Sequence, residues 1–401
     1  MNTSVNSSTK PDTQSREHDP VMIIGTGLAG YTLARELRKL NRDVPIVLVT
    51  RDDGCFYSKP TLSNALAMKK QPAALVSFDA CAMAAQLGAT VRMYGHVERI
   101  LPQTHEVVVN GEHLRYRSLV LAMGADARRP GVTGSGAADI LSINDLSDYA
   151  RFRHVLEGCK SVAILGAGLI GCEFANDLVA AGYVVSLIDP AATPLSRLLP
   201  EKLGNAFAKE LLASGIHFYP GSNVAAMERS VTGYRLHLSD DAHIDADIVI
   251  SAIGVAPRTA LASAAGIQID QGIRTDAWCR TSVENIFALG DCAAIDGKVQ
   301  PYVLPIMHAA RALAGTLSGE PTRVQFPIMP ITVKTPAIPA VIVPSGGTGE
   351  WHVEEATGTP HSALRAIFRS PANDRPTGFA LLGAATEGKA LLVKTMTASA
   401  S

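Results

Sequence analysis

Two stretches of the chain share one pattern of hydrophobic and polar positions. In each, at least four consecutive apolar residues run directly into Gly-x-Gly-x-x-Gly, and the two copies begin at Val21 and Val162. A short apolar run predicts a strand buried on both faces, and the longer segment after the glycines predicts a helix. The pattern therefore predicts two strand–turn–helix units, with helices over about 28–40 and 169–181.

The same order of elements follows both turns. An apolar strand comes next in each unit, at 46–50 and 184–189, and each unit closes with an apolar strand that ends at Gly124 or Gly254. Strands that alternate with helices predict parallel sheets. Shorter elements are predicted as strands near 90–94 and 106–109 and as helical segments near 142–160 and 305–318.

The texture of the sequence changes at Phe326, where prolines begin to punctuate β-branched residues, which indicates a small β-rich domain. We therefore predict an α/β protein with two Rossmann-like dinucleotide-binding domains and a small C-terminal α+β domain. The predicted ranges are a disordered polar tail at 1–20, a first domain at 21–155 and 273–325, a second domain at 156–272, and a C-terminal domain at 326–401.

Each glycine of the repeated motif has a separate physical task. The first makes a tight turn, the second lets the backbone approach a pyrophosphate, and the third lets the helix pack closely on the strand. The helix N-terminus then faces the bound anion. The predicted contacts are Gly25, Thr26, Gly27, Leu28 and Gly30 in the first copy and Gly166, Gly168 and Gly171 in the second. Two such sites predict two dinucleotides and electron transfer between them.

The residue that ends the second strand of each unit bears on which dinucleotide binds. Asp189 stands there in the second unit, where an acid takes the ribose 2′-hydroxyl and repels a 2′-phosphate, so NADH is favoured over NADPH. The alternative is a surface acid that caps the turn before Pro190. The first unit has Thr50 and Arg51 instead, so ribose recognition there is predicted to rest on Thr50, on backbone groups or on Arg51.

Composition excludes several classes of function. The net charge of −1 and the pI of about 6.8 give no sign of a nucleic-acid or anionic-membrane partner, and no apolar run is long enough to insert into a membrane. The six cysteines form no C-x-x-C and no metal-ligand spacing, so no metal is expected. Scattered thiols favour a cytoplasmic protein with reduced cysteines over a disulfide scaffold.

These motifs resemble those of the two-dinucleotide-fold flavoprotein reductases, whose second FAD motif is similar to residues 281–291 here. The resemblance implies that the first glycine motif binds FAD and the inserted one binds NADH. It also implies that Asp291 holds the ribityl chain, and that Gly124 and Gly254 line the two sites.

Three further segments, 57–63, 166–177 and 332–336, resemble the bacterial rubredoxin–NAD⁺ reductases. That resemblance implies electron flow from NADH through FAD to rubredoxin, a small acidic iron protein, often for alkane hydroxylation. It places Lys59 beside the flavin, where a cation stabilises the reduced ring. It directs Glu173 towards the flavin–nicotinamide stack, and a Lys59–Glu173 pair is predicted.

The same resemblance brings Lys334 to the isoalloxazine edge and lines the FAD site with backbone at Val97 and Val303. Simpler interpretations remain open for two of these residues. Lys59 has the alternative of a solvated turn lysine, and Glu173 that of a first-turn acid favoured by the helix dipole.

The cysteines distinguish between subclasses of this fold. Disulfide reductases carry a C-x-x-C and oxidase relatives carry one redox cysteine after the second strand, a place held here by Lys59 and Pro60; Cys55 lies nearby but earlier. Without a thiol relay, electrons leave the flavin directly, which favours a one-electron metal-centre acceptor. The alternatives are a reductase of a [2Fe–2S] ferredoxin for a monooxygenase, an NADH oxidase, and an NADH-sensing flavoprotein. His308 is interpreted as structural, since hydride transfer to flavin needs no acid or base.

An acidic partner predicts a basic rim on this chain. The oligomeric state stays open, with a monomer favoured. The arginines proposed for the rim are Arg128, Arg129, Arg311, Arg365, Arg369 and Arg375.

Replacement of Asp189 by alanine is expected to remove the preference for NADH over NADPH, because the carboxylate that repels the 2′-phosphate is lost. Steady-state rates with each nucleotide measure this preference. Unchanged discrimination would show that Asp189 is not its determinant.

Overall fold

The computed structural model describes residues 18–355 and 363–400, and its chain divides into two compact units. The first unit comprises 1–57, 76–125 and 257–325, and the second comprises 58–75, 126–256 and 326–401. Most of the predicted tail at 1–20 lies outside the described residues. The three predicted domains do not coincide with these units: 58–75 and 126–155 lie in the second unit, and 257–272 lies in the first.

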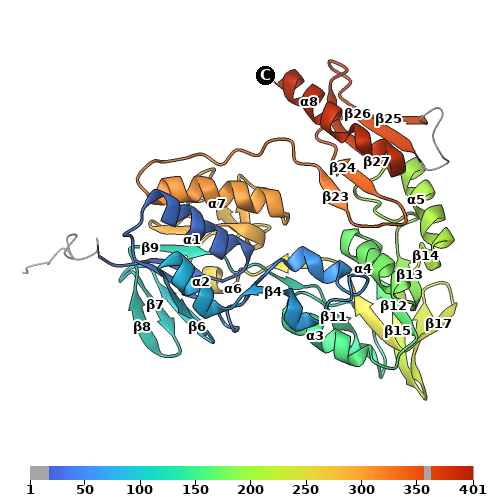
Figure 1. Ribbon diagram of the computed structural model, residues 1–401, viewed down its shortest axis with the longest axis horizontal. Helices are drawn as coiled ribbons and strands as arrows, with labels where there is room; N and C mark the ends of the chain where they lie inside the picture. The colour runs from blue at the N-terminus through green and yellow to red at the C-terminus, as the bar shows by residue number, and fades with distance from the viewer. Residues whose placement is uncertain (1–17, 356–362, 401) are drawn as a thin grey trace, which may run out of the picture. The chain divides into compact units, whose positions relative to one another are not determined.

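The first unit is built on a five-stranded parallel sheet in the order β21-β9-β1-β2-β5. Helices α1 and α7 pack against each other, as Figure 1 shows in blue and orange. The bounds of these elements are β1 Val21–Ile24, α1 Leu28–Leu40, β2 Ile46–Val49, β5 Thr90–Arg92, β9 Ser118–Leu121, β21 Ile286–Ala288 and α7 Val303–Leu317. Every residue of β1 and β9 is buried, so the continuous apolar runs form central strands.

Smaller elements complete the first unit. Its second sheet is antiparallel and consists of β6 Val97–Leu101, β7 Glu106–Val109 and β8 Glu112–Arg115. The remaining elements are β3 Phe56–Tyr57, β4 Val76–Phe78, α2 Ala80–Leu87, α6 Ala260–Ala264, β20 Ile273–Thr275, the short 3₁₀ helix η5 Gly290–Cys292 and β22 Ala293–Ile295. The chain passes between the units near β10 Ala125–Ala127 and β19 Val255–Pro257.

The second unit repeats the plan with a parallel sheet in the order β11-β18-β12-β13-β14. The bounds of its elements are β11 Leu141–Ser142, α3 Leu146–Val155, β12 Ser161–Leu165, α4 Leu169–Ala180, β13 Val184–Asp189, α5 Glu201–Ala213, β14 Ile216–Pro220 and β18 Ile248–Ser251. An antiparallel layer of β15 Val224–Ser230, β16 Gly233–Leu238 and β17 His243–Ala246 supplies apolar side chains to the same core. Three 3₁₀ helices, η2 Lys59–Asn64, η3 Pro72–Leu75 and η4 Ala137–Asp139, complete this part.

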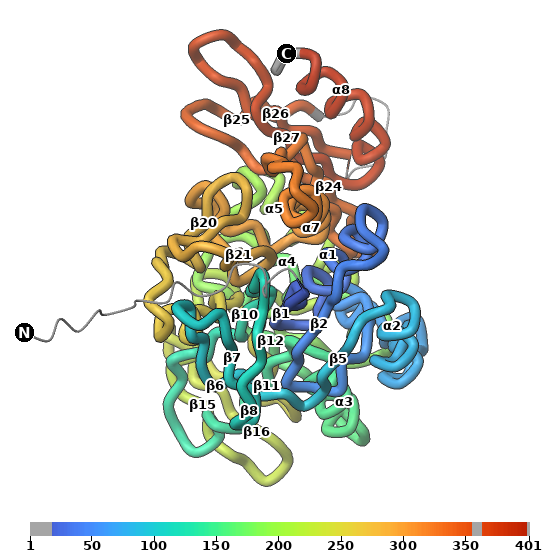
Figure 2. Tube along the Cα trace, turned by 90° about the vertical axis from the view of Figure 1, so that its left-hand side faces the viewer, coloured from blue at the N-terminus to red at the C-terminus, as the bar shows by residue number. Residues whose placement is uncertain are grey.

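The C-terminal part of the second unit is a five-stranded antiparallel sheet in the order β23-β24-β27-β26-β25, with helix α8 packed on it (Figure 2). Its elements are β23 Ile331–Val333, β24 Ala340–Val343, β25 Glu350–Glu355, β26 Leu364–Arg369, β27 Pro376–Leu382, the 3₁₀ helix η6 Gly383–Gly388 and α8 Lys389–Ala400. Leu392 and Met396 of α8 enter a core with Phe379 and Leu381. The predicted α/β fold with a small C-terminal α+β part is thereby confirmed.

Close backbone packing explains the third glycine of the motif. A Cβ built at Gly30 would lie 1.9 Å from the Gly25 carbonyl oxygen, and one at Gly171 would lie 1.8 Å from that of Gly166. Any side chain here forces the helix away from the turn. The motif thus fixes how each helix leaves its strand.

Gly30→Ala is expected to lower the free energy of unfolding by about 1–3 kcal/mol, because the added methyl overpacks a backbone contact. Gly27→Ala is the matched control, since a Cβ there meets no atom within 4 Å. Urea-induced unfolding of both variants measures the difference. Equal stabilities would contradict this account of the turn.

Candidate functional site

The first glycine loop has the shape that a bound pyrophosphate requires. Gly25 has a φ of 114°, which favours glycine, and a Cβ there would lie 2.2 Å from the Ala122 carbonyl oxygen. Gly27, at the N-terminus of α1, has open space where a side chain would stand. No side chain of the described residues caps this end of the helix. Its free N–H groups and the helix dipole therefore favour an anion.

The second glycine loop repeats this geometry. Gly166 has a φ of 103°, and a Cβ at Gly168, the N-cap of α4, would meet no atom within 4 Å. At both loops the first and third glycines are closed in by backbone, whereas the second is open. The residues present thus fit one dinucleotide at each loop.

Asp189 lies at the second loop, as the sequence predicted, and its carboxylate is hydrogen-bonded to the loop backbone. Its Oδ2 atom accepts a hydrogen bond from the Ala167 N–H at 2.6 Å, and Oδ1 accepts one from the Ala191 N–H at 2.8 Å. The second bond is the turn cap that was the alternative interpretation. A carboxylate has about four acceptor positions, so a ribose hydroxyl can still be bound.

At the corresponding place in the first unit, Thr50 uses its hydroxyl on a neighbour. Thr50 Oγ1 donates to Asp52 Oδ1 at 2.5 Å, and the Gly54 N–H donates to the same oxygen. Asp52 is an acid that the sequence analysis did not single out, because it stands beyond the end of the strand. It is exposed, and it joins Thr50 and Arg51 as a candidate for ribose recognition.

Four other residues predicted to bind FAD also lie in the first unit, whereas Lys59 and Lys334, predicted to lie by the flavin ring, do not. Asp291 follows β21 in η5, and its Oδ1 atom is buried. Gly124 has a φ of 70°, and its carbonyl accepts the Arg258 N–H at 3.0 Å. Val97 begins β6 and Val303 begins α7. Lys59, Glu173, Lys334 and Gly254 lie in the second unit with the second glycine loop.

An ion pair between a buried carboxylate and a partly exposed lysine is the main feature of the second unit. Glu173 on α4 is 1% exposed, and its Oε2 atom lies 2.9 Å from Lys334 Nζ. Ser63 Oγ donates to the same oxygen at 2.5 Å, and the Lys334 N–H donates to Oε1 at 3.0 Å. The Lys334 ammonium also donates to Ser63 Oγ at 3.1 Å and to the Pro60 carbonyl. Three acceptors match the three protons of the ammonium.

The predicted pair between Lys59 and Glu173 is wrong. Lys334 is the cation beside Glu173, whereas the exposed Lys59 amine donates to Asn144 Oδ1 at 2.7 Å. The physical reason is that a carboxylate this deeply buried needs hydrogen-bond donors beside it. Lys334 supplies two of them, its ammonium and its backbone N–H. Whether Lys59 and Glu173 take part in the chemistry stays a prediction.

The cysteine nearest the predicted flavin segment and the three buried cysteines lack the character of a redox nucleophile. Burial and a hydrogen bond with Asp53 raise the pKa of Cys55 to about 11. Burial likewise raises the pKa of Cys172, Cys279 and Cys292. A thiol reacts as its thiolate, so these residues are poor relays at neutral pH.

Half of the arginines proposed for a basic rim have acidic partners. Arg311 lies 3.9 Å from Glu36, Arg365 lies 3.5 Å from Glu354, and Arg369 lies 3.2 Å from Asp374. Arg128 donates to the Val255 carbonyl at 3.1 Å. The three ion pairs reduce the positive charge that half of the predicted rim can offer.

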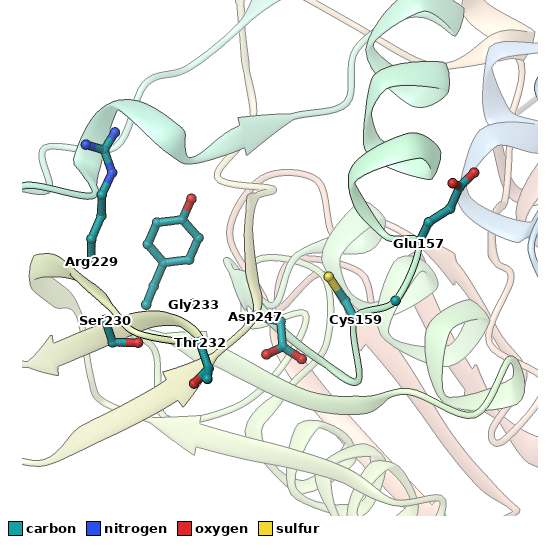
Figure 3. A pocket seen from close by; sticks show the side chains of 9 residues that line it. Glu157, Cys159, Arg229, Ser230, Thr232, Gly233 and Asp247 are labelled. Carbon is teal, nitrogen blue, oxygen red and sulfur yellow. The ribbon is translucent and has the colours of Figure 1, made fainter.

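An open cavity of about 510 Å³ lies elsewhere in the second unit, lined by Glu157, Cys159, Arg229, Asp247 and neighbouring residues (Figure 3). Arg229 pairs with Asp139 at 2.8 Å, and this pair holds the pKa of Asp139 below its usual value. The cavity contains none of the predicted site residues. Within the described ranges, no group of His, Cys, Asp and Glu could hold a metal ion, and no helix is long and apolar enough to cross a membrane.

Residues 19–314 match the family model of the pyridine nucleotide-disulphide oxidoreductases. The chain belongs to this family. Residues 323–396 match a second model, described as the rubredoxin binding C-terminal domain. The two expected cofactors, FAD and NADH, are those of the family.

Similar proteins cover nearly the whole chain. The rubredoxin-NAD(+) reductase of Alcanivorax borkumensis is 44% identical over 94% of this chain and 99% of that protein. The rubredoxin-NAD(+) reductase of Acinetobacter baylyi is 45% identical over 94% of this chain and 97% of that protein. The resemblance drawn from the motifs is therefore confirmed.

A solved structure has the same fold. The covalent putidaredoxin reductase–putidaredoxin complex has a TM-score of 0.84 and 26% identity, covering 94% of this chain and 93% of that chain. The oxidoreductase family thus accounts for the duplicated glycine loops, and its nucleotide chemistry accounts for their open second glycines.

Lys334→Met is expected to lower the free energy of unfolding by about 2–3 kcal/mol, because it leaves a buried carboxylate without its cation, which is itself 37% exposed. The double variant Lys334→Met/Glu173→Met is expected to recover part of this loss. Arg235→Met is the control, since it breaks a pair with Asp245 in which both side chains are at least half exposed, worth about 1 kcal/mol at most. Chemical denaturation measures all three, and similar losses for Lys334→Met and Arg235→Met would contradict the prediction.

Proposed function

We propose that this protein is an FAD-dependent reductase that passes electrons from NADH, one at a time, to rubredoxin. The observation that carries the proposal is the presence, in one chain, of an oxidoreductase module with two dinucleotide loops and a C-terminal part that matches the rubredoxin binding domain. Relatives at 44% and 45% identity that are named rubredoxin-NAD(+) reductases support it.

The residues divide the work according to their chemistry. The glycine loops at Gly25 and Gly166 bind the two pyrophosphates at helix N-termini. Asp189 binds the 2′-hydroxyl of the adenosine ribose and selects NADH, and Asp291 binds the ribityl chain. Bound FAD supplies the ability to accept a hydride and to release single electrons. Lys59 and Lys334 supply positive charge for the reduced flavin, and Glu173 holds Lys334 in place.

The class of electron acceptor is inferred from the low reactivity of the cysteine nearest the predicted flavin segment. The raised pKa of Cys55, about 11, makes a cysteine relay or a cysteine-dependent oxidase mechanism a poor fit. Direct transfer from flavin to an iron centre needs no protein thiol. This supports a small iron protein as the acceptor over a disulfide or oxygen.

The wider role follows the same resemblance. We propose that the protein acts in the cytoplasm, as a monomer, in a chain that feeds alkane hydroxylation. The scattered, unpaired cysteines support a reducing compartment.

The test is NADH-dependent reduction of purified rubredoxin, with a [2Fe–2S] ferredoxin and a dye acceptor measured in parallel. We expect rapid reduction of rubredoxin that weakens as salt is raised, because charged surfaces guide the encounter. Faster reduction of the ferredoxin would assign the other acceptor class. Dye reduction with neither iron protein would refute the proposed partner and leave the oxidase and sensor alternatives.

A further inference from the structure

Helix α4 carries three buried polar side chains on one face, and the proposed function uses only the first. Glu173, Asn176 and Asp177 are 1%, 7% and 2% exposed. Polar groups at this depth cost free energy unless they are hydrogen-bonded, so their partners show what the face is for. Those partners come from two segments that lie far away in the sequence.

The first segment contains η2 and the turn that follows it. Glu173 accepts the Ser63 hydroxyl, and Asp177 accepts the Leu66 N–H at 3.0 Å through Oδ2 and the Ala67 N–H at 2.7 Å through Oδ1. Ser63 and Ala67 are four residues apart, and so are Glu173 and Asp177, which places both acids on one helix face. Two contacts of matched spacing fix both the position and the rotation of this segment along α4.

The second segment belongs to the C-terminal part of the same unit. The backbone N–H of Lys334 donates to Glu173, and the Ala337 N–H donates to Asn176 Oδ1 at 3.3 Å. Asn176 is held in turn, because its Nδ2 atom donates to the Cys172 carbonyl at 3.0 Å. The face of α4 therefore fixes the backbone on both sides of the Lys334 side chain.

Asp177 differs from Glu173 in what it touches. Its carboxylate accepts hydrogen bonds from the backbone N–H groups of Leu66 and Ala67, and burial raises its pKa even though those bonds favour the charged form. The carboxylate therefore serves to hold the backbone at Leu66 and Ala67. That backbone belongs to the segment that carries Lys59 and Ser63.

We infer that Asp177 is a positioning residue of the reductase: it locks the 59–67 segment against the nicotinamide-binding helix and so sets the positions of Lys59 and of Ser63, which contacts Lys334. The inference rests on the proposed function, since that assigns the two lysines to the flavin. In this role Asp177 acts through the backbone of the 59–67 segment and does not itself touch either cofactor.

The test compares Asp177→Asn with Asp247→Asn in the FAD-loaded full-length protein. The amide keeps the volume of Asp177 but turns an N–H₂ group towards one of the two backbone donors. Asp247 is a matched control in the same unit, because its Oδ2 atom also accepts two successive backbone N–H groups, those of Lys160 at 2.7 Å and Ser161 at 2.9 Å. The measured quantities are the rate constant of flavin reduction by NADH in stopped flow, the flavin reduction potential and the NADH dissociation constant.

We expect Asp177→Asn to slow flavin reduction about tenfold or more and to shift the flavin potential, because small displacements of positioned groups are costly to rate. The NADH dissociation constant should change less than threefold. Asp247→Asn should leave the rate constant within twofold of wild type and the potential within error of it, although it removes the same charge. Its two backbone donors share one oxygen, which the amide keeps. Equal effects of the two variants, or no effect of Asp177→Asn, would overturn the inference.

A second measurement needs no substitution. Amide hydrogen exchange at Leu66 and Ala67 in the wild-type protein should be strongly slowed, and exchange at the rate of an unstructured peptide would overturn the inference if Asp177→Asn does not fold. These readouts do not involve an electron acceptor. Failure of wild-type protein to reduce rubredoxin would therefore refute the proposed function separately.

Discussion

The ion pair between the buried Glu173 carboxylate and Lys334 is the interaction on which the second unit depends. A carboxylate that is 1% exposed is tolerated only with compensating donors, and three of them converge on it from Ser63 and from the amine and backbone of Lys334. The pair joins helix α4, the 3₁₀ helix η2 and the strand β23 region, which are separated by more than a hundred residues of sequence. An error in any of the three segments would leave a charge buried without its partner. The pair thus favours one arrangement of these segments over others.

Helix α4, which carries Glu173, has two distinct features along its length. Its N-terminus, at Gly168, has no side-chain cap among the described residues and so suits an anion, and its middle carries the buried polar face of Glu173, Asn176 and Asp177. One rigid element therefore links the nucleotide-binding loop to the segment of Lys59 and to the part of the chain that matches the rubredoxin binding domain.

The two glycine loops show how much of a site can be encoded locally. Both have a first glycine at positive φ, a second that faces open space, and a third that lies against backbone. The acids near them differ: Asp189 bonds directly to its loop, whereas Asp52 stands beyond the strand end and is reached through Thr50. Each unit thus has the same strand, turn and helix, and the two loops differ in the side chains beside them.

The sequence by itself determined the duplicated fold, the two dinucleotide loops and the family, because glycine spacing and apolar runs act over a few residues and need no distant partner. It also placed Asp189 at the end of its strand and α7 within a few residues of its bounds. The pairing of Glu173 with Lys334 instead of Lys59, and the bonds of Asp177 to Leu66 and Ala67, were decided only in the tertiary structure. Both lysines are plausible partners by charge, and only packing places one ammonium beside the buried carboxylate. Backbone donors such as Leu66 N–H are present at almost every residue, so no residue type could have revealed which of them a buried acid would bind.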